Sequence, residues 1–264
     1  MANKYLARED SPFGQEIWEI LDTAMKQTAE GLLTGRRLLD VEGPLGLGLK
    51  SVPMEDAETE AGIITSQVLP VVYIHKSFEL GTRDLANYER DPIGLNTGPV
   101  SEIASECARL EDDLIFYGTG NVPGLMTVDG SNSMNMLAWD EVGAAAKGII
   151  EAITRLDEAG FHGPYSLALA PERYNLLFRL YPQGKQSELE HIKTMVTDGI
   201  FKTPSLKAGG LLLASKVQCA SIVLGQDMSI GFVGPAGAKQ EFTISESLAL
   251  RIRQPQAICV LKEA

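Results

Sequence analysis

Histidine, cysteine and long apolar runs are all scarce in this chain, and each scarcity argues against a class of function. Its 264 residues include only three histidines, which lie far apart and form no paired metal-ligand motif such as H-E-x-x-H. The sequence also lacks a run of about 18 apolar residues, so it predicts no membrane-spanning helix. We therefore expect neither a metal centre nor a membrane partner.

The cysteines give no further sign of a metal site. Cys107, Cys219 and Cys259 are widely separated, odd in number and without metal-ligand spacing. Each lies in an apolar stretch of sequence, so we interpret all three as buried, reduced thiols.

Positive charge is also in short supply. Lys and Arg total 23 against 35 Asp and Glu, which gives a formal net charge of −12. A general nucleic-acid binder needs a basic surface to displace counterions from phosphates, so the composition argues against a nucleic-acid partner. Residues 1–10 mix charged and polar side chains and lack the apolar segment of a signal peptide. We expect a protein that stays in the cytoplasm.

Catalytic motifs are missing from the chain as well. It contains no G-x-S-x-G nucleophile elbow, no Walker A loop and no G-x-G-x-x-G dinucleotide motif. The carboxylates at residues 111–113 occupy adjacent helical positions that face different directions, so we interpret them as a solvated face. We expect no catalytic residue and no cofactor. An enzyme stays open as an alternative, because catalytic sites also assemble from residues distant in sequence.

Helical and extended patterns mix along the chain without strict βαβ alternation, which indicates an α+β fold. Ser11 and Pro12 predict a helix start, as N-cap and first helical residue. Ile17, Leu21 and Met25 then recur at helical spacing and form one apolar stripe.

Further elements follow from periodicity and turn residues. Helices are expected over residues 84–90, about 101–118 and about 140–159, and strands over 36–41, 165–170, 211–215 and 217–224. Residues 46–72 form a long excursion between strand-like flanks, which predicts a projecting hairpin. A polar loop is expected over residues 182–190, and residues 239–262 are strongly β in pattern.

Five segments, in the same order along the chain, resemble sequence motifs of encapsulin shell proteins. They are residues 35–46 (GRRLLDVEGPLG), 110–118 (LEDDLIFYG), 163–165 (GPY), 224–231 (LGQDMSIG) and 242–247 (FTISES). Phe232 stands where the fourth motif continues with tyrosine. The resemblance implies the HK97-type fold of tailed-phage capsid proteins.

The family fold implies a domain plan for this chain. It places an N-terminal helix and arm at residues 1–45, an extended loop (E-loop) at 46–72, a peripheral domain at 73–130 and 223–264, and an axial domain at 131–222. Family members assemble into closed icosahedral shells and enclose cargo enzymes that carry a C-terminal targeting peptide. The implied function is therefore a shell subunit that forms a homo-oligomer, with a ferritin-like iron-storage protein or a dye-decolorising peroxidase as cargo.

The resemblance also implies two sets of site residues. Cargo-peptide binding is expected at Ile17, Leu21, Met25, Arg36, Asp40 and Ile230. A five-fold pore is expected to be lined by Gln183, Lys185, Gln186 and Glu188. The alternatives are that the apolar stripe is core, that the charged residues form a structural ion pair, and that residues 182–190 are a mobile surface loop.

Two further alternatives concern function and cofactor. A phage or prophage capsid subunit would share the fold, and a peptidase-like enzyme is a third hypothesis that suffers from the missing nucleophile–base pair. Some family members bind flavin beside a tryptophan, but Arg83 stands at that position here. We therefore expect no flavin on this shell.

Overall fold

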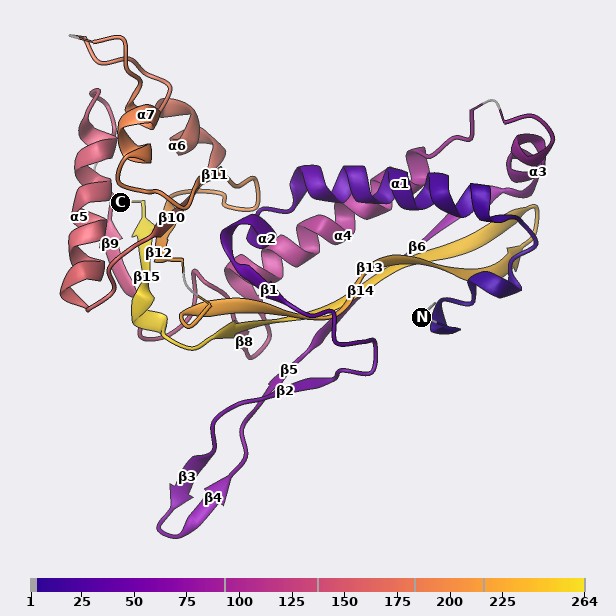
Figure 1. Cartoon of the computed structure of the whole chain (residues 1–264), viewed down its shortest axis with the longest axis horizontal. Helices are drawn as coiled ribbons and strands as arrows, with labels where there is room; N and C mark the ends of the chain where they lie inside the picture. The colour runs from indigo at the N-terminus through magenta and orange to yellow at the C-terminus, as the bar shows by residue number, and fades with distance from the viewer. Residues whose placement is uncertain (1–3, 93, 137, 183, 216, 264) are drawn as a thin grey trace. The chain divides into compact units, whose positions relative to one another are not determined.

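The computed structural model describes residues 4–92, 94–136, 138–182, 184–215 and 217–263 (Figure 1). Its contacts divide the chain into two compact units. Unit 1 comprises Met1–Leu33, Glu42–Glu111 and Val223–Ala249, and unit 2 comprises Thr34–Val41, Asp112–Ile222 and Leu250–Ala264. Residues 112–130 and 250–264, assigned to the peripheral domain in the sequence-based plan, group with unit 2. The domain boundaries drawn from the resemblance stay predictions.

Unit 1 contains most of a four-stranded sheet with the order β1-β13-β14-β6. Its strands are β1 (Asp40–Glu42), β6 (Val72–Gly81), β13 (Ala220–Ala236) and β14 (Lys239–Ile252). Strands β14 and β6 pair antiparallel, which sets Phe242 opposite Phe78 with stacked rings 5.1 Å apart. Phe13 and Trp18 contact Phe242 at ring distances of 5.5 and 5.8 Å, so an aromatic cluster joins the N-terminal region to the sheet.

Helix α1 (Gln15–Leu32) carries the apolar stripe predicted from the sequence. It begins four residues later than Ser11, with Gly14 at the N-cap, so the predicted helix start is wrong. The Ser11 hydroxyl instead donates to the Arg8 carbonyl oxygen at 2.7 Å and accepts from Trp18 Nε1 at 3.3 Å. These bonds occupy the side chain that was expected to cap the helix.

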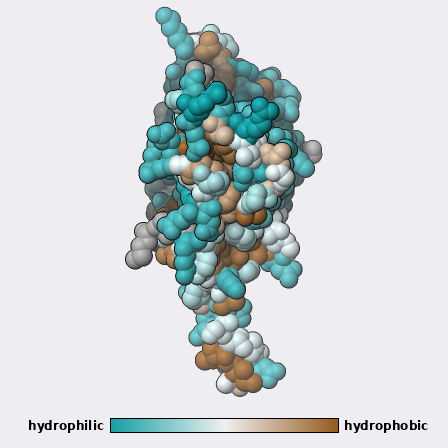
Figure 2. Space-filling view, turned by 90° about the vertical axis from the view of Figure 1, so that its right-hand side faces the viewer, coloured by the Kyte–Doolittle hydropathy of each residue, from teal (hydrophilic) through white to brown (hydrophobic). Residues whose placement is uncertain are grey.

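Two further helices and a two-stranded arm complete unit 1. Helix α3 spans Thr82–Arg90, and helix α4 (Gly98–Tyr117) has its first part in this unit. In the arm, β2 (Ser51–Pro53) pairs with β5 (Val68–Pro70), and β3 (Ala57–Glu60) pairs with β4 (Ile63–Thr65), where the sequence predicts a hairpin. Ile63 and Ile64 near its tip are 51% and 68% exposed, and Figure 2 shows this end of the arm as an apolar surface.

The glycine-rich segment after β1 makes a close backbone approach. Gly43 has φ +122°, and a Cβ at this position would lie 2.5 Å from the Leu224 carbonyl oxygen. The same oxygen accepts a hydrogen bond from Leu45 N at 2.9 Å. A side chain at residue 43 would therefore separate this segment from β13.

Unit 2 contains a five-stranded sheet with the order β11-β10-β12-β15-β9. These strands are β9 (Asn132–Asn135), β10 (Tyr165–Leu169), β11 (Ile200–Lys202), β12 (Gly210–Ala214) and β15 (Ile258–Lys262). Helices α5 (Ala144–Glu158), α6 (Pro171–Leu176) and α7 (Glu188–Lys193) belong to the same unit, as does the short hairpin of β7 (Gly118–Thr119) and β8 (Val122–Pro123). Ile149, Leu156 and Leu167 are fully buried in its core.

A buried carboxylate accepts hydrogen bonds from the backbone at the start of unit 2. Asp112 accepts hydrogen bonds from Thr34 N at 3.0 Å and from Gly35 N at 2.9 Å. Residues 35–38 accordingly form helix α2 (Gly35–Leu38), where a strand was predicted. Glu111 and Asp112 are 0% and 2% exposed, so the interpretation of residues 111–113 as a solvated face is wrong for these two side chains.

All three cysteines are buried and none is in a disulfide bond, as the sequence predicts. Desolvation raises the pKa of Cys107 to about 12 and that of Cys259 to about 11. Among the described residues, no helix joins the length and the apolar character that crossing a bilayer requires.

Candidate functional site

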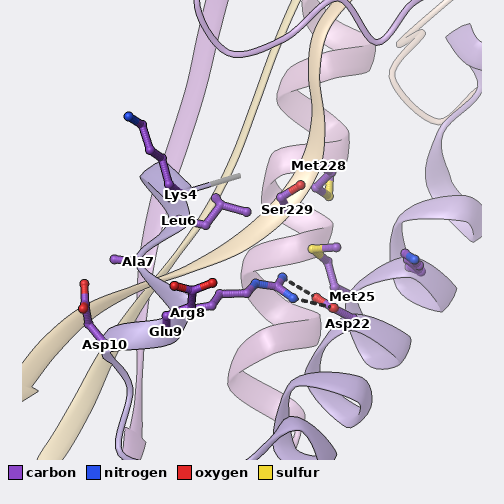
Figure 3. Close-up of a pocket in the computed structure, with 11 residues that line it drawn as sticks. Lys4, Leu6, Ala7, Arg8, Glu9, Asp10, Asp22, Met25, Met228 and Ser229 are labelled. Atoms are coloured by element: carbon purple, nitrogen blue, oxygen red, sulfur yellow. Dashed lines mark hydrogen bonds and ion pairs between the residues drawn. The ribbon is translucent and has the colours of Figure 1, made fainter. Parts of the chain in front are cut away.

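A cavity of about 560 Å³ lies in unit 1 between the N-terminal segment, helix α1 and strand β13; we name it the N-terminal groove (Figure 3). Its lining residues come from these three chain segments: Lys4, Leu6, Ala7, Arg8, Glu9, Asp10, Asp22, Met25, Lys26, Met228 and Ser229. The N-terminal segment here means residues 4–11, which contain the 3-10 turns Lys4–Leu6 and Arg8–Asp10.

Arg8 connects the three segments around the groove. Its two terminal nitrogens donate to the Asp22 carboxylate at 2.8 and 2.7 Å, and its Nε donates to the Ile230 carbonyl oxygen at 2.8 Å. The guanidinium also lies over the Trp18 ring, with Cζ 4.5 Å from the centroid. A bidentate pair with a carboxylate is among the stronger polar contacts in proteins, and the ring adds a cation–π contact.

Four apolar side chains also line the groove, beside the charged Lys4, Glu9, Asp10 and Lys26. Leu6 and Ala7 contribute from the N-terminal segment, Met25 from α1 and Met228 from β13. Figure 3 shows the two methionines approaching each other from the helix and the strand. Methionine side chains are flexible and polarizable, so this pair can adapt to an apolar side chain of a bound peptide.

The expected cargo-peptide residues of unit 1 occupy different environments. Met25 lines the N-terminal groove although its side chain is only 2% exposed, whereas Ile17, Leu21 and Ile230 do not line it. These three side chains are 1%, 0% and 0% exposed, so they belong to the buried interior of unit 1. Ile230 contributes to the groove wall indirectly, because its carbonyl oxygen holds Arg8. For Ile17 and Leu21 the structure agrees with the alternative that the stripe is core.

Arg36 and Asp40 lie in unit 2, in a polar pocket of about 310 Å³. The pocket is also lined by Arg37, Leu38, Leu39, Asp198, Leu213, Ser215 and Ala220. Asp40 is exposed and Arg36 is half-buried. Guanidinium and carboxylate groups on one surface can recognise the charges or the backbone of an extended peptide.

Lys185 and Gln186, two of the predicted pore residues, lie in a tight turn of unit 2. Gly184 N donates to the Tyr181 carbonyl oxygen at 3.1 Å, and Tyr181 N donates to the Gln186 carbonyl oxygen at 3.1 Å. The side chains of Lys185 and Gln186 are exposed. Gln183, the fourth residue of that set, lies outside the described residues.

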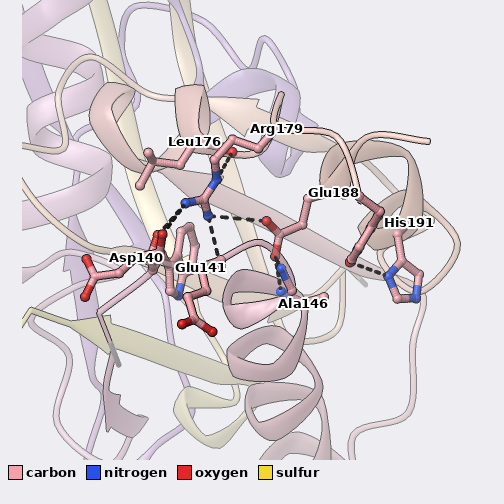
Figure 4. A network of polar contacts seen from close by, with 10 residues as sticks. Asp140, Glu141, Ala146, Leu176, Arg179, Glu188 and His191 are labelled. Carbon is pink, nitrogen blue, oxygen red and sulfur yellow. Dashed lines mark hydrogen bonds and ion pairs between the residues drawn. The ribbon is translucent and has the colours of Figure 1, made fainter. Parts of the chain in front are cut away.

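Glu188, unlike Lys185 and Gln186, is not exposed. Its side chain is 0% exposed, so it cannot line a pore, and its assignment to the pore is wrong. One carboxylate oxygen accepts from Gly143 N and Ala146 N at 3.0 Å each, and the other lies 3.4 Å from an Arg179 nitrogen (Figure 4). The N-cap of α5 is Gly143, which has no side chain, and Glu188 supplies the missing acceptor.

The same network holds the chain on both sides of the turn. Arg179 donates to the Trp139 carbonyl oxygen at 2.7 Å and to the Leu176 carbonyl oxygen at 3.0 Å. Tyr181 contacts His191 Nδ1 through its hydroxyl at 2.9 Å, and burial raises the pKa of this tyrosine. The turn that presents Lys185 and Gln186 is thus fixed to helices α5 and α7 by polar contacts.

Arg8 and Met228 are groove residues that reasoning from the sequence missed. Arg8 is one basic residue in the mixed-charge N-terminus, and nothing in its local pattern indicates that its partners are 14 and 222 positions away. The start of helix α7, in contrast, could have been predicted from the sequence. Ser187 and Glu190 form a capping box, whose S-x-x-E spacing marks a helix start inside the supposed loop.

Solved structures of a virus-like particle and a phage capsid share the fold of this chain. A virus-like particle from Pyrococcus furiosus superposes with a TM-score of 0.78 at 22% identity, over 94% of this chain and 100% of that chain. The capsid of Myoviridae phage XM1 superposes with a TM-score of 0.66 at 17% identity, over 89% and 92% of the two chains. At these identities the likeness establishes the predicted HK97-type, α+β fold.

Sequence comparison identifies the family within this fold class. The family model described as "Encapsulating protein for peroxidase" matches residues 3–249. The type 1 encapsulin shell protein of Myxococcus xanthus is 30% identical over 98% of this chain and 97% of its own length. A diheme-cytochrome-encapsulin shell fusion protein of Kuenenia stuttgartiensis is 28% identical, over 94% of this chain and 73% of its length. The chain belongs to the encapsulin family, and it is a shell subunit.

Proposed function

We propose that shells built from this subunit enclose an enzyme whose C-terminal targeting peptide binds in the N-terminal groove. The observation that carries the proposal is the groove itself, a cavity of about 560 Å³ beside α1 with apolar and polar walls. A shell relative that is named as a fusion with a diheme cytochrome supports the view that enzymes reside with these shells. A separate cargo chain needs a non-covalent attachment site in place of the fusion.

The groove walls suit a short peptide with an apolar anchor. Leu6, Met25 and Met228 can surround one apolar side chain, while the Arg8–Asp22 pair lies at the polar side of the cavity. Apolar anchors in a groove supply most of the affinity in peptide recognition of this type. Arg36 and Asp40 are proposed as further contacts for peptide charges or backbone, on the resemblance that first indicated them.

Lys185 and Gln186 are proposed to line the five-fold pore, and the E-loop arm at residues 46–72 is proposed to contact a neighbouring subunit. The support is their exposure in the first case and the exposed Ile63 and Ile64 in the second. A charged ring around a symmetry axis multiplies one residue's field, so Lys185 would favour passage of anions.

The proposed cargo is a ferritin-like iron-storage protein or a dye-decolorising peroxidase, and the shell itself is proposed to be structural and cytoplasmic. The support for a peroxidase is the description of the matching family model. A relative from Pyrococcus furiosus, named a ferritin-like-encapsulin shell fusion protein, supports the iron-storage cargo. In both cases the reaction would belong to the enclosed enzyme.

The test begins with shells purified from native cells, whose co-purifying enzyme is identified by mass spectrometry. The C-terminal segment of that enzyme is then fused to a fluorescent protein and co-expressed with the shell subunit. Ser229→Trp should abolish loading, because the indole fills the groove. Val233→Trp is the matched control, because Val233 lies four residues along the same strand, is 55% exposed and does not line the groove. Equal loading of both variants would contradict the proposal.

A further inference from the structure

We propose that Arg8 is the positioning residue of the N-terminal groove: it holds the N-terminal segment in place as the groove's third wall. The inference rests on the proposed function and adds to it a requirement on the peptide site. Arg8 itself need not touch the peptide. It acts by fixing Leu6, whose side chain extends toward the side of the groove that holds Met25 and Met228 (Figure 3).

The groove depends on the N-terminal segment. Of the eleven lining residues within the described part of the chain, six lie between Lys4 and Asp10, and the others belong to α1 and β13. If the segment moved away, the remaining residues would form an open face of a helix and a strand. An apolar anchor gains affinity from being surrounded, so the same peptide would bind an open face less tightly.

Arg8 makes polar contacts from the segment to both of its neighbours, and Ser11 adds a bond from Trp18 Nε1 of α1. Arg8 bonds Asp22 of α1 with two nitrogens and the Ile230 carbonyl oxygen of β13 with the third. The Arg8 and Asp22 side chains are each 28% exposed, so solvent screens their attraction only in part. The residue before Arg8 needs such an anchor, since Ala7 has φ +50°, a conformation that alanine rarely adopts unaided.

The segment also lies close to the backbone of β13. A Cβ built at Gly231 would be 3.2 Å from the Leu6 carbonyl oxygen. This close approach places Leu6 beside the strand at the position next to Ile230, whose carbonyl oxygen receives Arg8 Nε. Arg8 and Leu6 therefore set the position of the segment together, and loss of the arginine would release the apolar wall.

The chemistry of this position calls for arginine in particular. Three nitrogens of the planar guanidinium donate to two partners while its face lies over the Trp18 ring at 4.5 Å. A lysine ammonium has one nitrogen and cannot bridge a carboxylate and a carbonyl while stacking on a ring. Arg8→Lys should therefore restore only part of the function that Arg8→Ala loses.

The experiment measures binding of one probe to assembled shells. The probe is a fluorescent protein fused to the C-terminal segment of the enzyme that co-purifies with native shells. We expect Arg8→Ala to raise the Kd about tenfold or more, Asp22→Asn to raise it less, and Arg8→Lys to fall between wild type and Arg8→Ala. The matched control is Lys239→Ala, which breaks the exposed 2.8 Å ion pair with Glu79 elsewhere in unit 1 and should leave the Kd unchanged.

A second readout separates a positioning role from a general loss of structure. Hydrogen–deuterium exchange of residues 4–10 in wild-type shells should slow when the probe binds, because the peptide covers this wall. In Arg8→Ala shells that still assemble, the same residues should exchange faster while residues 72–81 of β6 keep their protection.

Each outcome decides the inference. Unchanged affinity in Arg8→Ala overturns it while the proposed function stands, and so does tighter binding, which would make the segment a competitor of the peptide. If wild-type shells do not bind the probe at all, the proposed function fails and the inference fails with it. If Arg8→Ala does not assemble, hydrogen–deuterium exchange of residues 4–10 in wild-type shells is the deciding measurement. The inference is overturned if that exchange does not slow when the probe binds.

Discussion

Replacing Glu188 by alanine removes a carboxylate on which three partners converge in unit 2. Gly143 N and Ala146 N each donate to it at 3.0 Å, and the Arg179 guanidinium lies 3.4 Å from its second oxygen. The side chain is fully buried, so water cannot replace it without entering the core. The substitution leaves the first turn of α5 without its acceptor and Arg179 without its carboxylate partner.

The magnitude follows from these losses. Removing a helix-capping acceptor costs roughly 0.5–2 kcal/mol. Breaking a buried ion pair costs about 3–5 kcal/mol. Arg179 is 26% exposed and keeps its bonds to the Trp139 and Leu176 carbonyl oxygens, so losing this ion pair should cost at most about 3 kcal/mol. We expect about 3 kcal/mol in total for Glu188→Ala. Glu188→Gln keeps an acceptor and should cost about 1 kcal/mol.

The assay is thermal denaturation of assembled shells followed by circular dichroism, together with the permeability of the shell to a small anion. A loss of about 3 kcal/mol should lower Tm by roughly 6–12 °C. The matched control is Gln186→Ala on the same turn, which is exposed and should change stability by less than about 0.5 kcal/mol. An unchanged Tm with altered anion permeability in Glu188→Ala would place this side chain on the pore and refute the reasoning.

Three further predictions concern backbone, thiols and pH. Gly118→Ala should destabilise the subunit by about 2 kcal/mol or more, measured as a fall in Tm, because φ is +76° and a Cβ would meet backbone atoms of residues 122 and 124. A thiol reagent at pH 8 should label none of the three cysteines in folded shells and all three after unfolding, because burial raises the pKa of Cys107 to about 12; rapid labelling of folded shells would contradict this. A hydrogen bond from Arg173 lowers the pKa of Glu263 below 4.5, so the stability it adds is present above about pH 4.5 and is lost as pH falls through the lowered pKa. Denaturant titrations should therefore show Glu263→Gln below wild type by up to about 1 kcal/mol at pH 7 and equal to it at low pH, and an equal deficit at both pH values would contradict the assignment.

The sequence predicts elements with strong local periodicity. Ile17, Leu21 and Met25 indicate a helix by their spacing alone, and α1 contains them. The same spacing does not distinguish a core stripe from a ligand groove, because that depends on what covers the stripe. Here all three side chains are buried, and Met25 alone among the three lines the groove, a difference that arises from chain segments that are distant in sequence.

Long-range polar contacts explain the remaining errors. Residues 35–38 fold as a helical turn beside the Asp112 carboxylate, which is 77 positions away from Gly35. Glu188 was placed on the pore by the family resemblance of the polar segment 182–190, yet its partner Gly143 is 45 positions away. In each case the local pattern is polar or extended, and a single buried carboxylate determines the outcome. Such contacts are not visible in local periodicity.

Electron microscopy of purified shells co-expressed with the cargo fusion tests the central claim most directly. The account predicts closed particles with fluorescent cargo inside and peptide density in each N-terminal groove, between residues 4–10, Met25 and Met228. Particles no larger than a dimer, or closed shells whose cargo peptide lies elsewhere on the subunit, would contradict it.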